Sequence, residues 1–579
     1  MYSTKNLSLI SKIILLTLLL ISFYNGIFSP PPLVTFTTDE NFIGESGIFL
    51  LFGITPRALE WAALPSTIIA YIIFIIWCFL SLIKNFSSIQ GLPDILTIFD
   101  RNAFYYLSHR EEFVIWERYI QIILVGIIIY KTTQFIIHSK HPTLKLELKF
   151  ILIFLCLCSE ILWIPVPLIR PEAVSGSLFL YLIIRILFTE KINPKTAAVL
   201  LIIFILSFTQ RLIFLFFGPF VIGTVLIHLR QQKIPWKTYL NYFGVIILAL
   251  FALMPFILTD TFVVLKSFLG GVFTKINHDK MDTFFNMSYI NNFIREPLNL
   301  VFSFFCIIGL WFFYKIYPVK SIAVAFILNF LFILYSSLKA AQLYDSHTFP
   351  LSIMAIILIA FGIYGMVLMV NENLKKWVLI TLSLFLMANT VLSIQKNKIS
   401  VNEQQQNLAD AIGWIKSLNN NEKILLSLNF DGLIPKNKSC LLREYSANAN
   451  EDYRINKLSK LLKIAKTDSI SKFTLPILAQ SFAFEDEKLF DTQYQIAIKY
   501  LETDKSKHFD TDYFFENNNN MSHCYVEKEA LNRFYEGKYH FIVSQIQLPN
   551  LKPIKSFLKR GGEIFWAYEF KEAKNSLIK

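Results

Sequence analysis

Strongly apolar segments, each close to the thickness of a bilayer, recur along the first two thirds of this chain, with short polar connections between them. Val245–Leu258, Ile322–Leu334 and Ile353–Val370 are apolar on every face, which is typical of membrane-spanning helices rather than amphipathic surface helices. We predict spans at about 6–28, 115–137, 149–164, 172–188, 196–208, 211–229, 238–259, 298–317, 319–337, 346–369 and 376–394. The expected fold is an α-helical polytopic membrane protein with about 11 transmembrane helices within residues 1–395.

The positive charges of the connections predict how these helices are oriented. If the N-terminus is cytoplasmic and Thr67–Ile83 does not cross the bilayer, the cytoplasmic connections carry twelve cations and the opposite short connections three. The twelve are Lys140, Lys145, Lys149, Lys191, Lys195, Arg230, Lys233, Lys237, Lys315, Lys320, Lys375 and Lys376, against Arg170, Arg211 and Lys339. Counting Thr67–Ile83 as a span would invert this asymmetry, against the positive-inside tendency. We therefore expect an interfacial or re-entrant helix there, inside an external segment 29–114.

The chain changes character after residue 395 and predicts an extracytoplasmic α/β domain over 396–579. Val401–Leu418 has the pattern of an amphipathic helix, and Asn517–Asn520 is expected to be a polar loop. Short strands are expected at Lys423–Leu428, Phe541–Gln545 and Glu563–Phe570, and helices near 453–466 and 487–502. Cys440 and Cys524 lie in this tail, and their spacing alone leaves open whether they form a disulfide.

The amino-acid composition supports a membrane protein rather than a nucleic-acid-binding protein. The chain is 54% apolar with a mean hydropathy of +0.49, and most loop cations lie beside spans, so we assign the net charge of +13 to membrane orientation rather than nucleic-acid binding. Lys5 and Lys12 flank the first apolar run, and no clear small-x-small site follows it, which predicts an uncleaved signal anchor. Frequent Asn, Lys and Ile favour a bacterial inner membrane, with the tail periplasmic or extracellular.

A few ionisable residues on the predicted outer face are candidates for chemistry. They are the adjacent acids Asp39 and Glu40, then Arg118, Arg170, Glu172, Arg211 and His347. Each could simply anchor a helix end by reaching toward the membrane surface, so their number on one face matters more than any single residue. A carboxylate can take the proton of an attacking hydroxyl or amine, and arginines can pair with a phosphate leaving group.

The order of several short motifs resembles a known family. Thr38-Asp39-Glu40-Asn41-Phe42, Gly53-Ile-Thr-Pro56 and Leu64-Pro65-Ser66 are followed by Arg118, Arg170-Pro-Glu172 and Tyr344-Asp-Ser-His347-Thr-Phe-Pro350. Over about 1–395 this is similar to GT-C class glycosyltransferases, and most similar to the branch with protein O-mannosyltransferases and the lipid A aminoarabinose transferase. The resemblance implies a polyprenyl-phosphate-linked sugar donor, a glycolipid, glycan or protein acceptor, transfer at the outer face with inversion, and Asp39 as the base.

The chain also departs from that pattern. Leu64 stands before Pro65 where relatives of the aminoarabinose transferase have a basic residue, His347 stands where many have Arg-Tyr, and Gln210 where some have Lys. No nucleotide cofactor is expected. The Asp39-Glu40 pair could bind a divalent cation, but the sequence shows no further set of metal ligands. Two alternatives remain: a transporter or flippase of lipid-linked saccharides, for which we find no internal repeat, and a non-catalytic membrane assembly factor.

Overall fold

The structure is a computed structural model that describes residues 4–28, 64–168, 170–210, 212–230, 235–253, 297–339, 345–418, 422–427, 513–518, 521–526, 531–532, 534–545, 547–548, 551–558 and 564–570. These residues are mostly helical and divide into two compact units. Among them, the first unit takes in 4–28, 64–66 and 118–397, and the second 67–117 and 398–570. The domain boundary expected at 395/396 stays a prediction.

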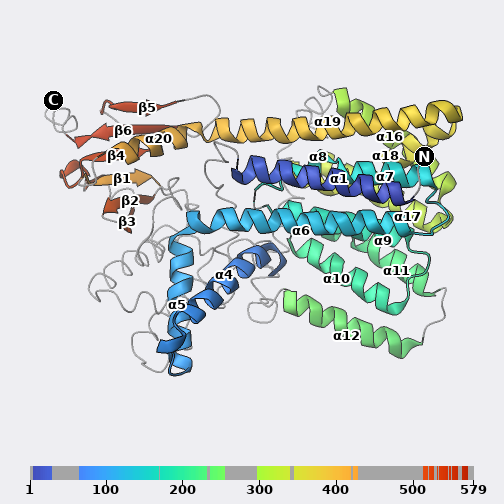
Figure 1. Ribbon diagram of the computed structural model, residues 1–579, viewed down its shortest axis with the longest axis horizontal. Helices are drawn as coiled ribbons and strands as arrows, with labels where there is room; N and C mark the ends of the chain where they lie inside the picture. The colour runs from blue at the N-terminus through green and yellow to red at the C-terminus, as the bar shows by residue number, and fades with distance from the viewer. Residues whose placement is uncertain are drawn as a thin grey trace. The chain divides into compact units, whose positions relative to one another are not determined.

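The secondary-structure elements described in the first unit are helices (Figure 1). Each span predicted from the sequence coincides with one or more of them. They are α1 (Thr4–Phe23), η1 (Tyr24–Phe28), most of α6 (Arg110–His138), α7 (Leu146–Leu157), α8 (Glu160–Trp163), α9 (Pro171–Phe188), α10 (Pro194–Gln210), η3 (Leu212–Phe217), α11 (Gly218–Arg230), α12 (Trp236–Leu253), α16 (Pro297–Ile316), α17 (Lys320–Lys339), α18 (Asp345–Leu368) and α19 (Glu372–Gln404).

Five of the described helices are long and apolar enough to cross a membrane. They are Thr4–Ile27, Glu112–His138, Leu298–Ile316, Pro350–Leu368 and Leu374–Glu403, and shorter apolar helices lie at Ile72–Lys84, Pro194–Thr209, Phe214–Arg230, Leu240–Leu253 and Lys320–Tyr335. The protein is thus a polytopic helical protein with membrane-spanning segments, whereas the number of crossings stays a prediction. Outward-facing side chains fit this class, because α16 exposes Phe304, Ile307 and Trp311 to an extent that water would penalise and lipid would not.

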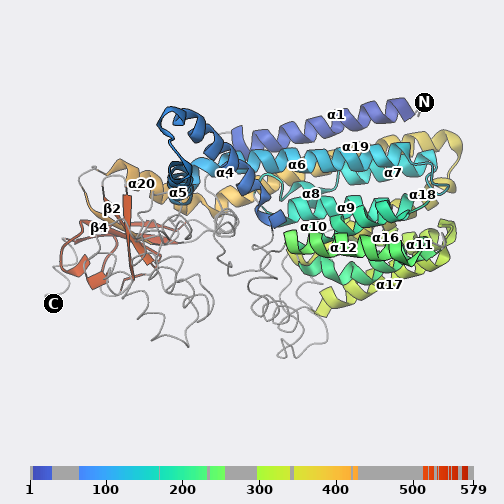
Figure 2. The same ribbon diagram turned by 90° about the horizontal axis from the view of Figure 1, so that it is seen from below.

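The helices of the first unit alternate in direction, and one end of the bundle collects the connections rich in lysine (Figure 2). There the Lys149 Nζ donates to the carbonyl oxygen of Ile137, in the last turn of α6, at 2.9 Å and to that of Ser139, just past its end, at 2.7 Å. The Tyr317 hydroxyl donates to the Leu187 carbonyl at the end of α9, at 2.6 Å. We call this the basic end. Its cations bond the last carbonyls of helices, where a helix carries partial negative charge.

Backbone contact between α16 and α18 holds the middle of the bundle. A Cβ on Gly309 would lie 1.8 Å from the Leu358 carbonyl oxygen, and one on Gly362 would lie 2.0 Å from the Phe305 carbonyl oxygen. Only glycine permits this approach, which is how helices inside a membrane commonly gain close packing.

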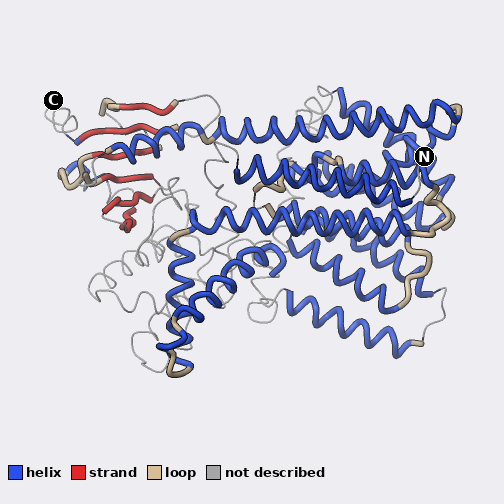
Figure 3. The backbone as a smooth tube through the Cα atoms, in the orientation of Figure 1, coloured by secondary structure: helices blue, strands red, loops and turns tan. Residues whose placement is uncertain are grey.

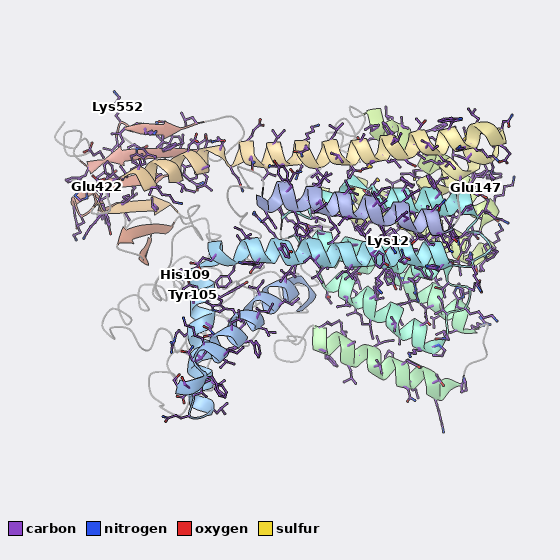
Figure 4. All side chains as sticks on the ribbon, viewed as in Figure 1. Lys12, Tyr105, His109, Glu147, Glu422 and Lys552 are labelled. Atoms are coloured by element: carbon purple, nitrogen blue, oxygen red, sulfur yellow. The ribbon has the colours of Figure 1, made fainter. Side chains whose placement is uncertain are left out.

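The second unit contains a helical part formed by α4 (Leu64–Lys84), mostly from residue 67 on, with η2 (Phe86–Ser88), α5 (Leu92–Ser108) and the first residues of α6. Phe74 of α4 packs edge-on against Phe99 and Tyr106 of α5, with ring centroids 5.1 and 6.0 Å apart. Where α5 ends, Tyr105 stacks on His109 at 4.1 Å (Figure 4). The stretch Thr67–Ile83 is helical, as expected; its placement outside the membrane core stays a prediction.

All described strands come from the tail and form one mixed sheet in the order β3-β2-β1-β4-β6-β5 (Figure 3). They are β1 (Ile424–Ser427), β2 (Tyr513–Asn518), β3 (Met521–Val526), β4 (Phe541–Ser544), β5 (Lys555–Phe557) and β6 (Phe565–Glu569). β1 and β4 are parallel and the other pairs antiparallel. The strands expected near 423–428, 541–545 and 563–570 are confirmed as β1, β4 and β6.

Alternation along the strands gives this sheet two apolar faces. Ile424 and Leu426 face a cluster with Leu408 and Ala411 of α20 (Gln406–Ser417), while Leu425 belongs to a separate cluster. The expectation that Asn517–Asn520 is entirely loop is wrong, because Asn517 pairs with Ser522, and Asn518 with Met521, across the β2–β3 hairpin. The helices expected near 453–466 and 487–502 lie outside the described residues, as does Cys440.

Candidate functional site

Of the residues singled out from the sequence, the structure describes the side chains of Arg118, Arg170 and Glu172. His347 is described only as part of the first turn of α18. Asp39, Glu40 and Arg211 lie outside the described residues. Arg118, Arg170 and Glu172 all belong to the end of the first unit away from the basic end, where α6 enters the unit and α9 begins. We call this end of the first unit, which contains Arg118, Arg170 and Glu172, the clamp end.

A polar face on α6 contributes the first part of the site. Arg118 is 2% exposed and Gln121 is 1% exposed, although both lie in a helix apolar enough to span a membrane. Residues three apart lie on the same face of a helix, so Arg118 and Gln121 are neighbours one turn apart. An ionisable or strongly polar side chain buried within such a helix is costly and therefore marks a functional position by default.

Gln121 binds the backbone of the segment that leads into α9. Its Nε2 donates to the carbonyl oxygens of Pro165 at 3.3 Å and Val166 at 3.0 Å, and also to that of Leu168. Its Oε1 accepts the backbone N–H of Arg170 at 3.2 Å. One side chain therefore bonds both carbonyl oxygens and an N–H group of this segment, and so ties α6 to the start of α9.

The start of α9 is fixed by its own sequence as well. Arg170 is the N-cap residue, with extended backbone angles of φ −125° and ψ 129°, and Pro171 occupies the first turn. Proline suits that position because its missing N–H has no helical partner there anyway. Glu172 follows in the first turn and is 6% exposed, so an acidic group stands where the helix carries partial positive charge.

Other elements of the first unit hold the same connection from further sides. A Cβ on Gly26 would lie 2.9 Å from the Pro167 Cβ, so η1 approaches the connection as closely as glycine allows. Asn389 donates to a Glu160 carboxylate oxygen at 3.1 Å, Ser393 donates to the same oxygen, and the Thr390 hydroxyl donates to the Cys158 carbonyl at 2.6 Å. The chain between α7 and α9 is thus bonded to α19 at Cys158 and Glu160, bonded to α6 through Gln121, and packed against η1 at Pro167.

Sequence reasoning missed Gln121, Glu160 and their partners. A signal was present for two of them, because Gln121 is a lone amide within an apolar run and Glu160 a lone acid between two apolar runs. What the sequence could not give is their partners, which for Gln121 lie more than forty residues further along the chain and for Glu160 more than two hundred.

The direction in which α18 runs places His347 at the clamp end as well. The carboxylate of Glu147, at the start of α7 on the basic end, acts electrostatically on Tyr364 in the last turns of α18. α18 therefore runs toward the basic end, and its first turn, which contains His347, lies at the other. Of the seven predicted site residues, Arg118, Arg170 and Glu172 therefore lie at the clamp end. The backbone of His347 lies at the same end.

No family model matches this chain, and no curated protein and no solved structure matches it. The resemblance to GT-C glycosyltransferases stays a prediction from the motifs. Within the described ranges, no group of three or more His, Cys, Asp or Glu side chains could hold a metal ion.

Proposed function

We propose that this protein is a glycosyltransferase that moves a sugar from a polyprenyl-phosphate-linked donor to a lipid, glycan or protein acceptor. The observation that carries the proposal is that buried Arg118 and Glu172 and half-buried Arg170 lie at one end of a helical bundle, where Gln121 of α6 bonds the backbone of Arg170. A phosphate that leaves during sugar transfer needs positive charge close to the bilayer surface, and two arginines at one end of the bundle supply it.

In this proposal the reaction is a single displacement at the anomeric carbon. Asp39 takes a proton from the acceptor hydroxyl or amine, whose lone pair forms the new bond to that carbon. The bond from the carbon to the phosphate oxygen breaks with inversion, and its electron pair leaves on the polyprenyl phosphate. Arg170 and Arg118 pair with the negative charge that develops there, while Glu172 orients Arg170. Glu40 is the second acid of the site, and Arg211 and His347 are assigned to substrate binding.

The charges at the two ends of the bundle support an orientation in the membrane that fits this reaction. The basic end carries the lysines that the positive-inside tendency places in the cytoplasm, so the clamp end faces outward in this proposal. The membrane is a bacterial inner membrane, and the tail with its six-stranded sheet is periplasmic or extracellular. The donor then reaches the site within the outer leaflet and needs no nucleotide.

The test is the comparison of surface glycolipids and glycoproteins by mass spectrometry in cells with and without the protein, together with cells that express Asp39→Asn. The amide preserves shape but removes the base, so product is expected to disappear while the protein stays in the membrane. Glu372→Gln is the matched control, because Glu372 is an exposed carboxylate at the basic end. Normal product from Asp39→Asn would refute Asp39 as the base, and identical glycans in all four strains would refute the transferase proposal and favour the assembly-factor alternative.

A further inference from the structure

The side-chain amide of Gln121 both donates and accepts hydrogen bonds with the backbone of residues 165–170. The donor end bonds the carbonyls of Pro165, Val166 and Leu168, and the acceptor end bonds the N–H of Arg170. The side chain is 1% exposed, so these bonds form away from water, where a missing partner would cost the most.

The sequence of that stretch explains why an outside side chain is required. Pro165, Pro167 and Pro171 have no N–H, so the stretch has more carbonyl acceptors than local donors. Its own backbone bonds include Val166 to the Trp163 carbonyl at 3.3 Å and Leu168 to the Pro165 carbonyl at 3.2 Å. Gln121 supplies the donor that the prolines lack.

The same contact sets the position of a charged residue. Arg170 is the N-cap residue of α9, and its backbone N–H is held by the Gln121 Oε1 at 3.2 Å. Arg118 lies one turn before Gln121 on the same helix face. The backbone of Arg170 is therefore tied, through an uncharged side chain, to the face of α6 that carries Arg118.

We propose that Gln121 is a positioning residue: it fixes the Pro165–Arg170 connection so that Arg170 and Arg118 engage one phosphate group together. This rests on the proposed function for the identity of the anion, but the mechanical part concerns only the connection. Gln121 bonds backbone groups in all four of these hydrogen bonds and acts on the anion through Arg170.

The mechanical part is tested by hydrogen–deuterium exchange of the full chain in lipid nanodiscs. Gln121→Met keeps the length of the side chain and removes all four bonds, so the amides of 166–173 are expected to exchange at least tenfold faster. Thr132→Val is the matched control, because Thr132 is equally buried on α6 but bonds only the Ile128 carbonyl of its own helix. Unchanged exchange in Gln121→Met, or equal acceleration in Thr132→Val, would overturn the proposal whatever reaction the protein performs.

The functional part is tested by a double-mutant cycle on transfer from a polyprenyl-phosphate sugar. Gln121→Met is expected to lower kcat/KM for the donor by roughly 10- to 100-fold, the range for small misplacement of a binding group. It should cause no further loss in an Arg170→Gln background, because its effect passes through Arg170. Gln121→Glu places a second acceptor against the carbonyls of Pro165, Val166 and Leu168, so it is expected to lower kcat/KM at least as far as Gln121→Met, and wild-type kinetics in Gln121→Glu would contradict the donor role.

The outcomes separate the two claims. Independent, multiplying effects of Gln121→Met and Arg170→Gln would overturn the positioning role. Wild-type donor kinetics in Arg170→Gln, combined with faster exchange in Gln121→Met, would refute the phosphate contact of the proposed function and leave the connection's dependence on Gln121 established.

Discussion

Gly362→Ala tests whether backbone contact between α16 and α18 stabilises the bundle. The added Cβ would lie 2.0 Å from the Phe305 carbonyl oxygen, 2.9 Å from its carbonyl carbon and 3.1 Å from the Gly309 nitrogen. All three atoms belong to backbone, so no rotamer change relieves the clash, and the helices must separate by more than 1 Å to reach an ordinary contact distance near 3.4 Å. Overpacking of this kind costs about 1–3 kcal/mol and occasionally more, and we expect about 3 kcal/mol here.

Gly244→Ala in α12 is the matched control, because nothing lies within 4 Å of the Cβ it would add. Both variants gain the better helix propensity of alanine, so their difference isolates the contact. The assay is thermal unfolding in detergent followed by a thiol-reactive dye, since Cys306 of α16 and Cys156 of α7 are buried and become reactive only when the bundle opens. The reasoning is refuted if Gly362→Ala unfolds at the same temperature as Gly244→Ala.

Three further predictions address the site, the orientation and the basic end. Arg170→Gln is expected to cost about 2–4 kcal/mol of transition-state stabilisation in donor use, with partial rescue by Arg170→Lys, which lacks a two-pronged contact; unchanged donor kinetics would contradict this. A single cysteine at 100 is expected to label from the external side of the membrane and one at 142 from the cytoplasmic side, and the reverse pattern would place Thr67–Ile83 across the membrane. Burial lowers the pKa of His141, with Glu190 acting in the opposite direction and His228 in the same one. The neutral form therefore stabilises the fold above about pH 6.5, and this is lost as the pH falls toward the lowered pKa; unfolding temperatures should fall less between pH 7.5 and 5.5 in His141→Phe than in the wild type.

The helices of the first unit could be predicted because each depends on a local property, an apolar run of sufficient length. Boundaries were less accurate where the apolar signal stops. The last span was expected to end at 394, but α19 continues to Gln404 through a polar stretch before α20 begins. A formed helix adds residues at little cost, so it can extend past the segment whose hydrophobicity marks it.

The tail shows the opposite case. β1, β4 and β6 carry apolar residues on both faces and were evident, whereas the β2–β3 hairpin contains a run of asparagines that resembles a loop. Asn517 and Asn518 are strand residues because of the partners across the hairpin, not because of their own preference. Gln121 and Glu160 were missed for the same reason: their role is set by partners far along the chain.

The two ends of the bundle treat positive charge in different ways, and this difference bears on function. At the basic end, Lys149 and Lys320 donate to backbone carbonyls near the ends of α6 and α16, so their charge is matched by the partial negative charge of a helix end. At the clamp end, Arg170 caps the N-terminus of α9, where the helix itself is positive. A cation there is electrostatically unfavourable unless an anion accompanies it. Glu172 in the first turn is one carboxylate that suits this position, and in the proposed function the phosphate of the donor is a further anion at the same helix end.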